Sequence, residues 1–113
     1  MAEDVELQLE MNEELWRTWL ASGIEPGMSF VVDFHFYFPE ERVAKTMASS
    51  LEEAGFSVKL SATRTLFILR GWEIEASAKH QWTLEYLNER TKEFCRSADE
   101  CGFSFEGIGA EMP

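Results

Sequence analysis

The sequence has little positive charge. Its 113 residues include 10 lysines and arginines against 21 aspartates and glutamates, so the formal net charge at pH 7 is -11. An extended contact with nucleic-acid phosphates or anionic lipid needs basic side chains to replace counterions. The composition therefore argues against a protein that binds nucleic acid directly or sits on a membrane surface, and it favours a basic protein partner.

Long apolar runs are also missing. No stretch approaches the roughly 20 apolar residues that a membrane-spanning helix needs, and the first four residues have neither the basic nor the apolar segment of an export signal. We therefore expect a cytoplasmic protein. With 45% hydrophobic and 13% aromatic residues, the chain has enough apolar area to form one globular domain over residues 1–113.

Cysteine is scarce, and the two present are Cys95 and Cys101. On one expected helix they point in different directions and lie too far apart for a disulfide. Their spacing also differs from the Cys-x-x-Cys pairs of redox and zinc sites. We interpret both as reduced side chains that pack on a sheet, and we expect no metal and no cofactor.

Sequence motifs of catalysis are absent. The chain has no phosphate loop, dinucleotide fingerprint, nucleophile elbow or zincin motif. Its one closely spaced glycine pair, Gly107 and Gly109, is typical of a bulged or bent final strand. Adjacent carboxylates such as Glu52 and Glu53 diverge on a helix and do not converge as an acid and a base. The sequence thus predicts a binding protein and not an enzyme.

One segment occurs twice. Residues 52–58, Glu-Glu-Ala-Gly-Phe-Ser-Val, recur as residues 99–105, Asp-Glu-Cys-Gly-Phe-Ser-Phe. Each copy describes a helix that ends at a glycine and is followed by a strand. A fold made of two similar halves leaves this kind of repeat in its sequence.

Residues 1–22 predict an acidic amphipathic helix. Its apolar positions follow helical spacing: Leu9, Leu15, Trp16, Trp19 and Leu20. The two tryptophans must bury a large area. Packing at the edge of the core is the favoured interpretation, and a homodimer or partner contact through this helix is the alternative. Gly23 and the Pro26-Gly27 pair then lead into a body that covers residues 28–113.

The body predicts the order strand, helix, strand, strand, helix, strand. Residues 30–38 alternate apolar and polar side chains and form the most regular strand. A helix follows, with Pro39 in its first turn and Gly55 at its end.

The second strand contains Phe56, Val58 and Leu60 and continues through the apolar run 65–69. Arg70-Gly71 is the expected turn into a third strand over residues 72–77. The last helix covers about residues 81–101, begins beside His80 and buries Cys101, and a fourth strand opens at Phe103.

This order is the doubled split βαβ unit of an α+β, ferredoxin-like sandwich. It has a four-stranded antiparallel sheet with two helices on one face, and here an extra N-terminal helix.

The strand phases place one group of polar side chains on the uncovered face of the sheet. If the phenylalanines of residues 30–38 face the helices, the opposite face carries Asp33, His35, Tyr37, Lys59, Glu73, Glu75 and Glu106. RNA-binding domains of this fold expose aromatic rings with basic residues on that face. Here the face is mostly acidic and would repel RNA.

Three interpretations of this face stay open: a solvated surface, a docking surface for a basic protein segment, and a metal or acid–base site that includes His35. A flat sheet seldom supplies the pocket that the third needs. The candidate partner-binding residues are Asp33, His35, Tyr37, Glu73, Glu75 and Glu106.

Four short segments together resemble one known family. They are residues 22–27 (Ser-Gly-Ile-Glu-Pro-Gly), the strand with His35, residues 54–58 (Ala-Gly-Phe-Ser-Val) and residues 102–109 (Gly-Phe-Ser-Phe-Glu-Gly-Ile-Gly). With them the chain resembles the regulator of ribonuclease activity B family, RraB, although Ile108 stands where that family usually has tryptophan.

The resemblance implies a small, acidic, cytoplasmic, noncatalytic protein. Such a protein binds the arginine-rich, noncatalytic region of ribonuclease E and inhibits the enzyme. The alternative is an adaptor or immunity-type protein of the same fold that acts on an unrelated basic partner.

Overall fold

Over residues 5–65 and 69–111, which the computed structural model describes, the chain forms three helices and four strands. In chain order these are α1 (Val5–Ala21), β1 (Phe30–Phe38), α2 (Glu41–Glu53), β2 (Ser57–Thr65), β3 (Leu69–His80), α3 (Leu84–Cys101) and β4 (Ser104–Ala110). The strands form one antiparallel sheet in the order β2-β3-β1-β4.

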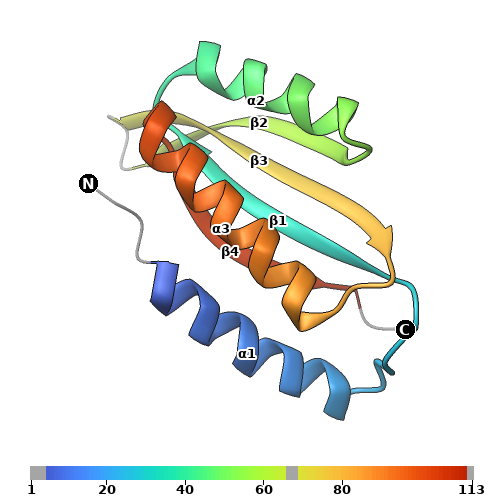
Figure 1. The fold of residues 1–113 in the computed structure, drawn as a ribbon. Helices are drawn as coiled ribbons and strands as arrows, with labels where there is room; N and C mark the ends of the chain where they lie inside the picture. The colour runs from blue at the N-terminus through green and yellow to red at the C-terminus, as the bar shows by residue number, and fades with distance from the viewer. Residues whose placement is uncertain (1–4, 66–68, 112–113) are drawn as a thin grey trace.

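Helices α2 and α3 cover one face of this sheet, and α1 lies beside α3 (Figure 1). The predicted ferredoxin-like α+β sandwich with an extra N-terminal helix is confirmed. None of the described helices is long and apolar enough to cross a bilayer.

Strand β1 organises the core. Every second side chain of the strand, beginning with Phe30, is buried, and the side chains between them are partly exposed. Phe34 has its ring centroid 5.3 Å from that of Phe94 in α3 and 5.8 Å from that of Phe56, both edge to face, an arrangement that aromatic pairs prefer. The alternation predicted for residues 30–38 is therefore confirmed.

The repeated segment ends both long helices of the body in the same way. Gly55 and Gly102 have φ of 97° and 77°, in the left-handed region that favours glycine. The residues that follow, Phe56 and Phe103, are buried, and their amides bond back to carbonyls in the last turn of α2 and α3. Each glycine thus turns the chain back under its helix and into a strand.

Helix α1 belongs to the core. Trp19 is only 4% exposed and lies edge to face with Phe30, with ring centroids 5.9 Å apart. Trp16 packs against the same phenylalanine at 6.2 Å. Packing of the tryptophans at the edge of the core, the interpretation that the sequence favours, is thus what the structure shows.

The buried face of α1 differs in detail from the prediction. Leu20 is 38% exposed, whereas Asn12, a polar residue, is buried. The Asn12 amide nitrogen donates to Thr91 Oγ1 at 2.9 Å and to Asn88 Oδ1 at 3.1 Å, both on α3. A buried amide is tolerated because these partners satisfy it.

The connection between β2 and β3 also differs. Thr63 pairs with Gly71 and Thr65 pairs with Leu69. The predicted turn at Arg70-Gly71 is therefore wrong, because both residues lie within β3. Residues 66–68, part of the predicted continuation of the second strand, lie outside the described residues.

Helix α3 begins later than expected. His80 is the last residue of β3 and pairs with Phe30, so it does not lie at a helix start. Thr83 is the N-terminal cap, and its hydroxyl accepts from the backbone amide of Tyr86 at 3.1 Å. Threonine at this position satisfies an amide that the first helical turn leaves free.

Two smaller expectations were wrong. Pro39 precedes α2, whose N-terminal cap is Glu40. Cys101 lies in the last turn of α3 and is exposed, whereas Cys95 is buried; neither is in a disulfide. Leu60 lies in the second strand as predicted, and on this edge strand, β2, its side chain keeps 37% exposure.

The burial of α1 yields a stability prediction. Trp19→Ala should lower the free energy of unfolding by about 3–5 kcal/mol, because it removes a large buried aromatic side chain. The neighbouring Leu20→Ala, on the exposed side of the same helix, should change it by about 0.5 kcal/mol or less. Urea unfolding followed by circular dichroism measures both, and equal effects would show that α1 does not dock as described.

Candidate functional site

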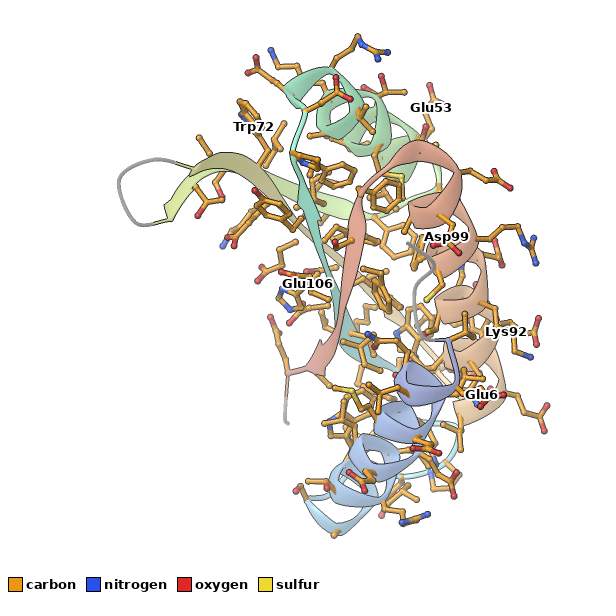
Figure 2. All side chains as sticks on the ribbon, turned by 90° about the vertical axis from the view of Figure 1, so that its left-hand side faces the viewer. Glu6, Glu53, Trp72, Lys92, Asp99 and Glu106 are labelled. Atoms are coloured by element: carbon orange, nitrogen blue, oxygen red, sulfur yellow. The ribbon has the colours of Figure 1, made fainter. Side chains whose placement is uncertain are left out.

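Polar side chains occupy the face of the sheet that α2 and α3 leave uncovered. We call this surface the open face; it comprises Asp33, His35, Tyr37, Lys59, Ser61, Glu73, Glu75, Ser77, Lys79 and Glu106. Figure 2 shows Glu106 on the side of the sheet away from α3. All six residues that the sequence nominates for a partner contact therefore lie on this one surface.

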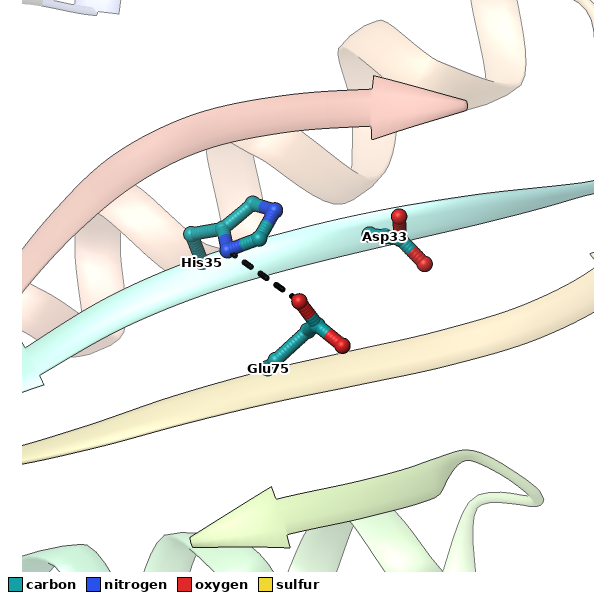
Figure 3. Close-up of side chains that lie close together, drawn as sticks. All are labelled: Asp33, His35 and Glu75. Carbon is teal, nitrogen blue, oxygen red and sulfur yellow. Dashed lines mark ion pairs between the residues drawn. The ribbon is translucent and has the colours of Figure 1, made fainter. Parts of the chain in front are cut away.

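Three potential ligands meet at the centre of the open face. His35 on β1 and Glu75 on β3 are direct cross-strand partners, and Asp33 precedes His35 by two residues, so it projects from the same face. His35 Nδ1 lies 4.0 Å from Glu75 Oε1. One ligand atom from each residue lies within 4.8 Å of the other two (Figure 3).

This group is held in place and is still accessible. Ser77, the cross-strand partner of Asp33, donates a 2.7 Å hydrogen bond from Oγ to Asp33 Oδ1. The side chains of His35 and Glu75 keep 43% and 41% of their surface exposed. A solvent-borne ligand can therefore reach the group without a rearrangement of the sheet.

Glycines keep the neighbouring part of β4 bare. Gly107 and Gly109 are the β4 partners of His35 and Asp33. A register shift opposite His35 and a φ of 121° at Gly107 mark a β-bulge, so the bulged final strand that the sequence predicts is confirmed. Glu106 immediately precedes this glycine and extends the acidic surface.

A cavity of about 210 Å³ opens on the same face. Its lining includes His35, Lys59, Ser61, Glu73, Glu75 and Glu106. All four strands contribute to this lining, and beyond the end of β1 the far ends of β2 and β3 turn away from α3 (Figure 2). This face therefore supplies a pocket of the kind that a flat sheet seldom offers.

The Tyr37 ring lies over the backbone of β3 at one end of the open face. A Cβ atom added to Gly71 would overlap the Tyr37 ring. The ring therefore packs against the backbone of β3 and does not stand free as the base-stacking rings of RNA-binding sheets do. The ring leaves no room for a side chain at position 71, so this glycine fits a strand contact and not the turn that was expected there.

Ser61, Ser77 and Lys79 are the residues of the face that the prediction missed. The third strand was expected to end at residue 77, although the alternation of Glu73, Glu75, Ser77 and Lys79 continues to the true end of β3. Lys79 adds a second cation to the face, beside Lys59. The alternation was the signal that could have found it.

Most of the ion pairs in the described residues lie on helices and not on the open face. Arg17 pairs with Glu13 and Lys45 with Glu41, each one helical turn away and exposed. Such pairs contribute only a few tenths of a kcal/mol. Within the described residues no lysine of the open face lies within 4.0 Å of a carboxylate oxygen, so the carboxylates there remain available to an external cation.

A comparison with protein families finds a match over nearly the whole chain. The family model described as Regulator of ribonuclease activity B matches residues 9–110, nearly the whole chain. A comparison with curated proteins finds none that matches. Ile108, where the family usually has tryptophan, pairs with Phe34 and packs against the core. This difference therefore leaves the open face unchanged.

The contact between Tyr37 and Gly71 can be tested by a double-mutant cycle. Gly71→Ala should lower the free energy of unfolding by about 1–3 kcal/mol, because the new methyl group displaces a packed ring. In a Tyr37→Ala background the same change should be neutral or slightly stabilising, since alanine is favoured over glycine within a strand. Denaturant unfolding gives all four values, and the same loss in both backgrounds would contradict the contact.

Proposed function

The chain belongs to the regulator of ribonuclease activity B family, and we propose that it inhibits a ribonuclease E-like enzyme by binding a basic, arginine-rich segment of it. The protein acts in the cytoplasm and catalyses no reaction itself. The observation that carries the proposal is the cavity of the open face, whose lining includes Glu73, Glu75 and Glu106.

The chemistry of this face suits guanidinium groups. A carboxylate accepts two parallel N–H bonds from one arginine, and this geometry is stronger and more specific than a contact with a point charge. Asp33 adds a fourth carboxylate beside the three of the cavity, against the two lysines at positions 59 and 79. The net charge of -11 also attracts a basic segment from a distance and raises its association rate.

Inhibition follows from competition for the same basic side chains. An arginine-rich segment of a ribonuclease can neutralise RNA phosphates. While the open face holds those arginines, they cannot contact RNA. The regulator thereby lowers RNA processing without touching RNA, from which its own charge excludes it.

A homodimer through α1 stays a prediction. The area of Trp16 and Trp19 is already used within the fold. A second copy would therefore meet the outer side of this helix, where Met11 is 41% exposed.

Charge-neutral variants of the open face test the proposal. The triple variant Glu73→Gln, Glu75→Gln and Glu106→Gln should bind a recombinant arginine-rich ribonuclease segment at least tenfold more weakly than the unchanged chain at low salt. The loss follows because three desolvated charge pairs are removed. Isothermal titration calorimetry over a salt series measures the affinity, and the affinity of the unchanged chain should fall steadily as the salt concentration rises.

A matched triple variant on the helices is the control. Glu52→Gln, Glu53→Gln and Glu100→Gln remove the same charge from exposed helical positions and should change the affinity less than threefold. Equal losses of affinity in the two triple variants would show that the effect comes from the net charge and not from the open face. No complex at low salt, or a pull-down from lysate that recovers another basic protein and no ribonuclease, would favour the adaptor role.

A further inference from the structure

We propose that Asp33, His35 and Glu75 form a binding site for a divalent transition-metal ion, with Zn²⁺ as its representative. One imidazole and two carboxylates are a ligand set that zinc accepts. The inference is independent of the ribonuclease partner, because it rests on the positions of three side chains alone.

Paired strands, and not a loop, determine the spacing of these ligands. The direct pairing of His35 with Glu75 brings their Cβ atoms to about 5 Å, and Asp33 lies one step along the same face. The ligand atoms already lie within 4.8 Å of one another. Around a tetrahedral zinc with bonds of about 2.1 Å they would be roughly 3.4 Å apart. Small side-chain rotations, without movement of the backbone, close this difference.

Asp33 is oriented before any ion arrives. The hydrogen bond from Ser77 holds Oδ1, which is the kind of supporting contact that positions metal-binding carboxylates. Asp33 Oδ2 and His35 Nε2 each lie 4.0 Å from the point where a Cβ of Gly109 would be. Both atoms thus lie near the same bare stretch of β4.

The surroundings leave room for the remaining ligands and favour a cation. Three protein ligands leave a fourth tetrahedral position to water, and Gly107 and Gly109 place no side chain over it. Glu106 and Glu73 add negative charge nearby. Lys59 is the β2 neighbour of Glu75 in the strand register, on the side of β3 opposite His35.

The imidazole determines which metals fit. Mg²⁺ and Ca²⁺ prefer oxygen ligands, whereas nitrogen from histidine suits zinc and its neighbours. The site should therefore prefer Zn²⁺ to Mg²⁺. A surface that attracted cations by charge alone would not make this distinction.

Titration of the full chain with ZnCl₂, followed by calorimetry, tests the site. One ion per chain is expected, and His35→Ala and the isosteric Glu75→Gln should each weaken binding at least tenfold. His80→Ala is the matched control, because His80 is the other of the two histidines and lies against the rings of Trp82 and Tyr86. It should leave the zinc affinity unchanged.

Nuclear magnetic resonance of the imidazoles gives a second measurement that does not depend on the variants. Zinc should shift the His35 signals and leave those of His80 in place, whereas MgCl₂ at the same concentration should shift neither. Absence of saturable zinc binding would overturn the inference. So would equal affinities for zinc and magnesium, or a loss on His80→Ala as large as that on His35→Ala.

Discussion

The alternation of β1 is the constraint on which both faces of this protein depend. Neighbouring side chains of a strand point to opposite faces, so the same nine residues supply the buried phenylalanines and the polar centre of the open face. A slip of one residue would expose the phenylalanines and bury Asp33 and His35, and each exposed ring would cost about 2 kcal/mol or more. The contact of Phe34 with Phe94 on α3 therefore also determines where His35 points.

Local patterns predicted those parts of the fold whose causes are local. Three features can be predicted from a few neighbouring residues. They are the alternation of residues 30–38, the glycines that end α2 and α3, and the tryptophans of α1. Gly71 was misread because its cause is not local: the Tyr37 ring, from another strand, needs the space that a side chain would fill. Thr83 was overlooked although its position before an apolar helical pattern is a local capping signal.

Local patterns likewise predicted one part of the candidate site and not the other. The alternation of side chains placed five residues on one face: Asp33, His35, Glu73, Glu75 and Glu106. This alternation repeats every two residues, so it does not determine which residues of neighbouring strands are paired. A shift of two residues would keep every side chain on its face and pair His35 with Glu73 in place of Glu75. The observed register brings Asp33, His35 and Glu75 together, and side chains from all four strands line the cavity. Both depend on pairing over the whole sheet, which no short segment encodes.

The two proposed ligands of the open face share Glu75 and are therefore coupled. A zinc ion held by Asp33 and Glu75 would offset the charge of two of the four carboxylates of this face and would leave Glu73 and Glu106 for arginine. Each ligand then lowers the affinity of the other by the same factor, as linkage requires. Because the ion would occupy the centre of the sheet and a peptide would extend over it, competition is expected from both charge and space. A face proposed to recognise a basic segment would by the same chemistry respond to the supply of a metal ion.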